Sequence, residues 1–231
     1  MTVIDIREEP SLHGLIQDMP QQFDKRLLDV FICLLLLPVG LILMALISVA
    51  IVLDSPGSPI FMQERIGKGG KRFRLLKFRS MRIDHDTTSD QAFMQAYIEG
   101  NIHYTQDERD PDRAFFKPPN QDKITRVGRV LRKTSLDELP QIFNILRGEM
   151  SLVGPRPNVP WEVEKYCDWH LERLKVLPGI TGLAQVRGRS NILFDEIVLY
   201  DIEYVRNLSL SLDLWILWQT FWIVLTGHGA D

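Results

Sequence analysis

An uncharged apolar run of 24 residues, from position 30 to position 53, constrains this chain more than any other feature. It reads VFICLLLLPVGLILMALISVAIVL, and 17 of its residues are Leu, Ile, Val or Phe. A helix of this length can cross the hydrocarbon core of a bilayer, and these side chains favour insertion by about 5 to 10 kcal/mol. A core helix rarely runs this long without a polar face, and a signal peptide has a shorter apolar region. The run therefore predicts a membrane-inserted helix.

Pro38 interrupts this run about a third of the way along its length. A proline removes one backbone hydrogen bond and clashes with the carbonyl four residues earlier, so we expect a kink there. Two topologies fit a kinked helix: a simple membrane span and a re-entrant helix that turns back at the proline. The basic residues that follow Leu53 place the C-terminal side in the cytoplasm, whereas Lys25 and Arg26 at the other end leave the topology open.

Charge is distributed in blocks that the net charge of -3 conceals. Eight Lys or Arg and one acid lie between Ser55 and Arg82, and eight acids accompany two arginines over residues 84–113. The balance argues against a nucleic-acid-binding protein, and the basic block suits a polyanion or a membrane surface. No C-x-x-C zinc pattern is present, and Cys33 lies in the apolar run, so we expect no disulfide framework.

These features suggest how the chain is organised. The expected parts are an N-terminal extension (1–22), a membrane-inserted helix (23–54) and a cytoplasmic domain (55–231) with an acidic insertion (84–120) and a C-terminal helix (208–226). We expect one helix in the insertion, near Gln91 to Glu99. The C-terminal stretch is interrupted by Asp213 and carries three tryptophans at helical spacing. Such a stripe favours the membrane–water interface, although a core-packed helix fits the pattern equally well.

The segment PIFMQERIGKGGKRFRLLKFRSMR predicts a strand, a glycine-rich turn and a second strand. The turn is not a Walker A loop, because its first glycine is absent and Arg72 stands where Ser or Thr is needed. Lys77 and Arg79 flank Phe78, so both cations would face one side of a strand. Such a pair is suited to a diphosphate, and a solvated edge strand protected by charge is the simpler alternative.

Two neighbouring carboxylates, Asp137 and Glu138, lie in the stretch RKTSLDELPQ. Ser135 and Glu138 have the S-x-x-E spacing of a helix capping box, and acids suit the positive end of a helix dipole. The apolar residues that follow are spaced as on the buried face of a short helix, which Gly148 would end. Plain capping explains this stretch unless other segments bring cations to the pair.

Two later segments combine arginine with glycine and proline. Three prolines and a glycine fix the irregular loop of residues 154–160 around Arg156. A rigid loop that holds an arginine suits an anion, because the guanidinium donates in a planar fork. The segment LPGITGLAQVRGR, residues 177–189, places glycines around Arg187 and Arg189. Glycines of this kind allow a ligand to approach the backbone closely.

Taken together, these stretches resemble the bacterial sugar transferase family, the monotopic phosphoglycosyl transferases that begin polysaccharide assembly. The matching stretches are FDKRLLD with the proline-broken apolar run, PIFMQERIGKGGKRFRLLKFRSM, TSLDELPQIFNILRGEMSLVGPRP and LPGITGLAQVRGR. The combination of LDELPQ, GPRP and PGITGLAQ is highly specific. The resemblance runs from about Phe23 to Leu225, apart from the acidic insertion, and it describes a short form with little sequence before the membrane helix.

The resemblance implies an α+β fold, in which a re-entrant anchor helix and interfacial amphipathic helices hold a small mixed helix–strand catalytic domain at the cytoplasmic face of the bacterial inner membrane. It implies that a UDP-sugar gives its sugar-1-phosphate to undecaprenyl phosphate and that UMP leaves. Asp137 matches the nucleophile, which forms a covalent phosphosugar intermediate, and Glu138 matches a neighbour that binds Mg²⁺ with it. The Pro38 break matches the family's re-entrant helix, which keeps both ends of the chain cytoplasmic.

The same matching assigns cations to the phosphates of the substrate. Lys77, Arg156 and Arg189 match phosphate-binding residues, and Arg132 is a weaker match. Arg79 is added to this set because it would lie on the same face of the strand as Lys77. A carboxylate that attacks a diphosphate must overcome the repulsion between two anions, so several fixed cations are needed. Two carboxylates at the start of a helix can cap the helix and also carry out this chemistry.

Two other functions remain open to the sequence. One is a catalytically inactive scaffold that binds nucleotide sugar at the membrane, and the other is a metal-dependent pyrophosphatase with water as the acceptor. Glucose and galactose are the sugars expected for a short member that initiates exopolysaccharide, capsule or O-antigen synthesis, and an N-acetylated or diamino sugar is the alternative. A homodimer and downstream glycosyltransferases are the protein partners that the resemblance brings into consideration, together with the lipids of the inner membrane.

Overall fold

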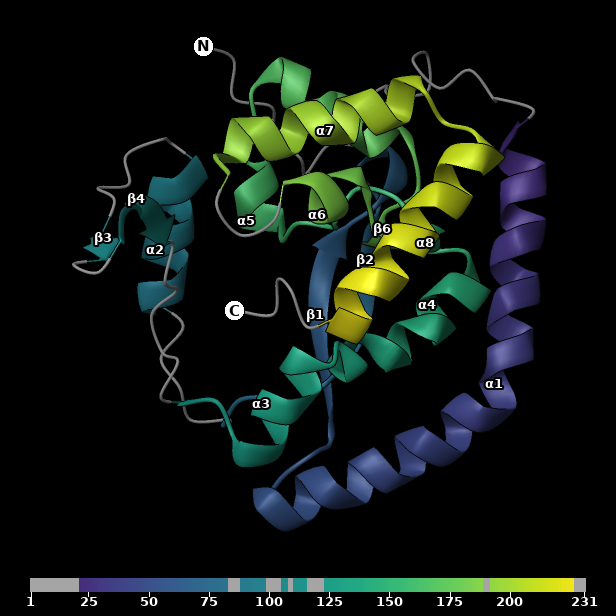
Figure 1. Cartoon of the computed structure of the whole chain (residues 1–231), viewed down its shortest axis with the longest axis vertical. Helices are drawn as coiled ribbons and strands as arrows, with labels where there is room; N and C mark the ends of the chain where they lie inside the picture. The colour runs from purple at the N-terminus through teal and green to yellow at the C-terminus, as the bar shows by residue number, and fades with distance from the viewer. Residues whose placement is uncertain are drawn as a thin grey trace.

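A computed structural model describes residues 21–82, 88–98, 105–107, 110–115, 123–188 and 192–226. In it a long apolar helix accompanies a small domain of mixed helices and strands (Figure 1). The helices are α1 (Gln21–Asp54), α2 (Thr88–Ile98), α3 (Arg126–Lys133), α4 (Ile142–Arg147), α5 (Pro160–Val163), α6 (Leu183–Arg187), α7 (Phe194–Arg206) and α8 (Leu210–Thr226), with 3₁₀ helices η2 (Lys68–Gly70), η4 (Leu136–Gln141) and η5 (Asp168–Lys175). The strands are β1 (Ile60–Ile66), β2 (Arg72–Phe78), β3 (Thr105–Asp107), β4 (Asp110–Phe115), β5 (Ser151–Val153) and β6 (Gly179–Thr181).

The helix α1 contains the apolar run and is bent. It descends along one edge of the molecule and then turns to pass beneath it (Figure 1), and Pro38 lies inside it. Prolines are a standard cause of sharp helix bends, so the predicted kink is present. Within the part of the chain that the structure describes, Phe23–Asp54 is the one helix long and apolar enough to cross a membrane, by length and composition.

Both ends of α1 are bonded to the same domain. Near its start, the buried Lys25 donates to the Val153 carbonyl at 2.9 Å and to Asp213 Oδ2 at 2.7 Å. At its end, Asp54 Oδ2 accepts a hydrogen bond of 3.0 Å from the Val127 amide at the start of α3. The charge of Asp213, which interrupts the apolar pattern of α8, is therefore paired inside the protein.

The predicted strand–turn–strand segment forms an antiparallel hairpin of β1 and β2. Its turn needs glycine, because Gly69 and Gly70 have φ values of 66° and 78°. The helix α4 is bonded to this hairpin through the fully buried Asn144, which accepts from the Leu76 amide at 3.0 Å and donates to the Arg74 carbonyl at 2.7 Å. The main core lies here, between α1, β2, α3 and α4.

The acidic insertion contains more regular structure than we predicted. The helix expected near Gln91 to Glu99 is present as α2, within the residues that the structure describes. An antiparallel pair, β3 and β4, follows it and was not predicted. The segment is polar and lacks the alternation of apolar residues that usually identifies a strand.

The C-terminal half is built around a short parallel pair, β5 and β6. Gly154 and Gly179 meet at this pair, and a Cβ on Gly179 would lie 2.1 Å from the Gly154 nitrogen. Gly179 therefore lets two backbone segments approach each other, whereas we expected the glycines of residues 177–189 to let a ligand approach the backbone. The helix α8 directs Asp213 and Ile216 inward, and Trp218 is 56% exposed. The helix therefore packs on the core along one side, as the core-packed alternative expects, while its tryptophan stripe stays partly exposed.

Candidate functional site

Six side chains from four separate segments line one polar pocket of about 310 Å³. The residues are Lys77 of β2, Arg132 of α3, Ser135 and the pair Asp137–Glu138 around η4, and Arg156 of the loop after β5. The pocket is large enough for a small ligand. It brings together the carboxylate pair and three of the cations that the sequence analysis selected.

The carboxylates lie on a 3₁₀ helix, and no capping box forms. Ser135 has a φ of 56° and provides no side-chain cap for η4. Among the described residues, it is the one residue other than glycine with a positive φ. The Glu138 side chain instead accepts from Arg156 Nη1 at 3.0 Å. Plain capping is therefore the wrong explanation for Ser135 and Glu138, and a backbone conformation of this kind is often found at functional sites.

The electrostatics of the pocket follow from burial and from its mixed charges. Burial raises the pKa of the Asp137 carboxyl and Glu138 raises it further, while Lys77 and Arg132 act in the opposite direction. Burial lowers the pKa of Lys77 to about 8, and the positive charge of Arg156 contributes to the shift. Both groups therefore lose part of the preference for the charged form that they have in water. An anionic ligand would favour the charged form of Lys77.

Two further arginines hold the loop that carries Arg156. Arg65 of β1 donates to the Pro157 carbonyl at 2.9 Å. The buried Arg173 donates to the Arg156 carbonyl at 3.1 Å and forms a 2.5 Å ion pair with Asp201 of α7. The loop is thus fixed at the carbonyls of Arg156 and of the next residue, while the Arg156 side chain itself is 57% exposed. Arg65 was not selected from the sequence, because nothing in the QERIG stretch indicates which carbonyl its side chain will reach.

Arg132 reaches the pocket because α3 packs closely on the segment after β2. Arg132 Nε donates to Ser80 Oγ at 2.9 Å. A Cβ on Gly128 would lie 2.1 Å from the Ser80 carbonyl oxygen, so only glycine permits this approach. Arg132, the weaker match to a phosphate-binding residue, therefore lies beside Asp137.

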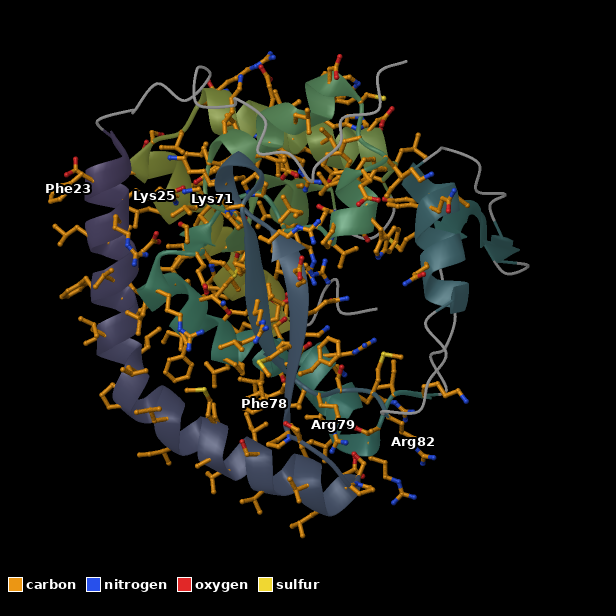
Figure 2. The ribbon with its side chains drawn as sticks, turned by 180° about the vertical axis from the view of Figure 1, so that it is seen from behind. Phe23, Lys25, Lys71, Phe78, Arg79 and Arg82 are labelled. Atoms are coloured by element: carbon orange, nitrogen blue, oxygen red, sulfur yellow. The ribbon has the colours of Figure 1, made fainter. Side chains whose placement is uncertain are left out.

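Arg79 does not join Lys77 in the pocket. It is buried and donates to the carbonyls of Ser55, Pro56 and Gly57, the segment that links α1 to β1. Figure 2 places it beside Phe78, at the end of the hairpin nearest the C-terminal limb of α1. The strand β2 ends at Phe78, so the alternation that should have put both cations on one face does not extend to Arg79.

The second arginine loop contributes differently from expectation. Arg189 lies outside the described residues. Arg187 forms an ion pair of 2.7 Å with Glu203 of α7, and its guanidinium lies 5.8 Å from the centre of the Trp215 ring. Arg187 therefore contacts α7 and α8, and it does not line the polar pocket.

Asp137 and Glu138 are suited to one kind of metal ion. Among the described residues, no group of three or more His, Cys, Asp or Glu side chains could enclose a metal ion. Mg²⁺ needs no such cage, because it commonly binds one or two carboxylates together with water and substrate phosphates. A divalent cation would also offset the repulsion between the two carboxylates that raises the pKa of Asp137. The donor set therefore fits Mg²⁺.

Known proteins match most of this chain. The chain is 41% identical over 209 residues to the undecaprenyl-phosphate galactose phosphotransferase of Salmonella typhimurium, covering 90% of this chain and 42% of that protein. It is 41% identical over 185 residues to the UDP-glucose:undecaprenyl-phosphate glucose-1-phosphate transferase of Xanthomonas campestris pv. campestris, covering 76% and 33%. The chain thus spans less than half the length of these relatives.

A shorter relative matches along most of both chains. The exopolysaccharide production protein ExoY of Rhizobium meliloti is 40% identical over 197 residues, which cover 85% of this chain and 81% of that protein. A sequence model described as bacterial sugar transferase matches residues 20–227. That match includes α1, every residue that lines the polar pocket and α8. The chain therefore belongs to the bacterial sugar transferase family.

Proposed function

We propose that this chain transfers a sugar-1-phosphate from a UDP-sugar to undecaprenyl phosphate and releases UMP. The observation that carries the proposal is the polar pocket, where two carboxylates meet Lys77, Arg132 and Arg156. A pair of unit charges about 4 Å apart contributes roughly 4 kcal/mol at an effective dielectric constant near 20. Several such cations would offset the repulsion between an attacking carboxylate and a diphosphate.

The reaction we propose consists of two displacements at one phosphorus atom. A carboxylate oxygen of Asp137 attacks the phosphorus that bears the sugar, the bond to the bridging oxygen breaks, and UMP leaves with the electron pair. A phosphate oxygen of the prenyl phosphate then attacks the same phosphorus and releases the Asp137 carboxylate. Covalent catalysis of this kind replaces one difficult transfer by two easier ones.

The other residues of the pocket would bind and orient the phosphates. Lys77, Arg132 and Arg156 would stabilise charge on the phosphate oxygens of both partners. Glu138, bonded to Arg156, would hold Mg²⁺ together with Asp137. Bound there, Mg²⁺ would neutralise charge that develops on the leaving phosphate.

The re-entrant topology, with both ends of α1 on the cytoplasmic side, is part of this proposal. Its support is that Lys25 at one end and Asp54 at the other are bonded to the same domain, while the helix between them is bent. The exposed tryptophans of α8 suit the membrane–water interface. Such an arrangement would hold Asp137 near the headgroups on the cytoplasmic face of the inner membrane, where the prenyl phosphate presents its phosphate.

The sugar that we propose is glucose or galactose, since relatives of similar identity are named for each of these sugars. The reaction would then be the first membrane step in the synthesis of an exopolysaccharide, capsule or O-antigen. The test is UMP release by the purified chain in lipid nanodiscs with UDP-glucose or UDP-galactose. We expect sustained release, beyond the first UMP per enzyme, that requires both Mg²⁺ and undecaprenyl phosphate.

A matched variant makes this test specific. Asp137→Asn keeps the shape of the side chain and removes its negative charge, so UMP release should fall at least about a thousandfold, a typical effect of losing a nucleophile. Release that persists without prenyl phosphate, with free sugar phosphate accumulating, would instead identify a pyrophosphatase. No release with either sugar, while the nucleotide sugar still binds, would favour an inactive scaffold.

A further inference from the structure

The outward face of α3 carries three cations and no acid. Arg126, Arg129, Val130 and Lys133 recur at positions i, i+3, i+4 and i+7 of the helix, so they share one face. All four are exposed, and Val130 is 61% exposed although it is aliphatic. We call these four residues the cationic face of α3. The transfer reaction does not use them.

The inner face of α3 is fixed against the protein, and this fixes the direction of the cationic face. Leu131 is buried in the main core, Gly128 packs on Ser80, and Arg132 lines the polar pocket. The helix therefore cannot rotate its cations inward without losing these contacts. The cationic face is directed away from the catalytic domain.

The cationic face lies where the apolar helix ends. The α3 amide of Val127 donates to Asp54, the last residue of α1, and Figure 1 shows α3 beside the C-terminal limb of α1. That limb exposes Val52 and Leu53, and Leu53 is 83% exposed. The carboxylate of Asp54 is occupied by the α3 amide. A membrane that covers the apolar limb would thus present its headgroups at α3.

We infer that the cationic face of α3 docks on the phosphate headgroups of anionic phospholipids and holds the mouth of the polar pocket at the membrane surface. Three Lys or Arg side chains at an anionic surface correspond to about a hundredfold preference over a zwitterionic one. Val130 would insert its side chain among the headgroups, as aliphatic residues of interfacial helices do. The inference rests on the membrane topology of the proposed function.

The experiment uses the full chain in nanodiscs and needs no turnover. Cys167, the exposed cysteine, is replaced by serine, and Val130→Cys carries an environment-sensitive fluorophore. We expect its emission to shift to shorter wavelength when phosphatidylglycerol is added to phosphatidylcholine discs. The shift should disappear in the triple variant Arg126→Gln/Arg129→Gln/Lys133→Gln, which removes all three cations of this face.

A control variant removes the same charge from other exposed positions. Lys71→Gln/Lys165→Gln/Arg206→Gln should keep the shift. Lys71 lies at the turn of the hairpin, at the end opposite Arg79 (Figure 2), and Arg206 ends α7, on the side of the molecule opposite α3 (Figure 1). The dependence of the emission shift on salt concentration is a second measurement, made on the protein that keeps all three cations. The shift should weaken as the Debye length falls from about 10 Å at 0.1 M to about 3 Å at 1 M.

The inference is overturned if the emission is the same in both lipid mixtures, or if the triple glutamine variant keeps the shift. A shift with undecaprenyl phosphate in phosphatidylcholine discs, without any shift from phosphatidylglycerol, would also overturn it and would identify a site for the lipid acceptor. Because the readout is independent of catalysis, failure of the proposed transfer reaction would leave the fluorescence result unchanged.

Discussion

Lys77 is the pocket residue whose charge should depend most on pH near neutrality. Its pKa is lowered to about 8, mainly by burial and further by Arg156. The ammonium is therefore present below that pH and lost above it. We predict that kcat/KM for the UDP-sugar, which reports groups of the free enzyme, falls above pH 8 by up to about tenfold per pH unit.

The matched substitution for this prediction is Lys77→Arg. A guanidinium keeps its charge throughout this range, so the variant should lose the alkaline decline even if its overall activity is lower. Lys71→Arg, an exposed position, should leave the profile unchanged. A decline that is identical in Lys77→Arg would assign it to another group.

Single residues also show how far sequence alone can identify the site. Asp137, Glu138, Lys77, Arg132 and Arg156 were selected by a family resemblance, and the structure brings all five into one pocket. Physical reasoning about the residues alone left capping and solvated-strand alternatives open, because each motif is common outside functional sites. The pocket depends on contacts between distant segments, which local patterns do not encode.

At the scale of elements, the loop that carries Arg156 depends on a buried ion pair. Arg173 and Asp201 are both almost fully buried. Asp201→Asn would leave the Arg173 guanidinium without its counter-charge, which typically costs 3–5 kcal/mol. We predict that Tm falls by roughly 10 °C and that KM for the UDP-sugar rises, because Arg173 also holds the Arg156 carbonyl.

The same helix provides a control for this prediction. Glu203 of α7 pairs with Arg187 at 2.7 Å, and both side chains are more than 40% exposed. Exposed pairs contribute less than about 1 kcal/mol, so Glu203→Gln should change Tm by only a few degrees. Equal losses of stability in Asp201→Asn and Glu203→Gln would contradict the argument from burial.

The elements differ in how well they could be predicted. The hairpin β1–β2 was predicted because its glycine turn and its apolar residues are local signals. The helix α4 was predicted from its apolar spacing, and Gly148 ends it with a φ of 81°. The capping box failed because Ser135 adopts a left-handed conformation, and the spacing S-x-x-E cannot report a backbone dihedral. The prediction that Arg79 shares a strand face with Lys77 was wrong because the strand ends at Phe78.

At the scale of the whole molecule, the bend in α1 allows both its ends to contact one domain. A straight helix of 34 residues is about 51 Å long, which exceeds the thickness of the hydrocarbon core. Pro38→Ala restores a backbone hydrogen bond and removes the steric clash. We therefore predict that a fraction of Pro38→Ala molecules cross the membrane, with the N-terminal end of α1 outside the cytoplasm.

This prediction is checked by labelling intact cells with a membrane-impermeant thiol reagent. Phe23→Cys, at an exposed position near the start of α1, should remain unlabelled when Pro38 is present and become labelled in the Pro38→Ala background. The proline is a local signal that predicts a bend, but the topology depends on contacts between α1 and the rest of the chain. Labelling of Phe23→Cys with Pro38 intact would contradict the re-entrant topology.

The central claim is that Asp137 becomes covalently bonded to a phosphosugar. The most direct test is intact-protein mass spectrometry of the chain in nanodiscs with Mg²⁺ and UDP-glucose or UDP-galactose, without prenyl phosphate. We predict a mass increase of one hexose phosphate that is absent in Asp137→Asn and disappears when undecaprenyl phosphate is added. The same increase in Asp137→Asn, or UMP release that depends on prenyl phosphate without any adduct on rapid quenching, would contradict the claim.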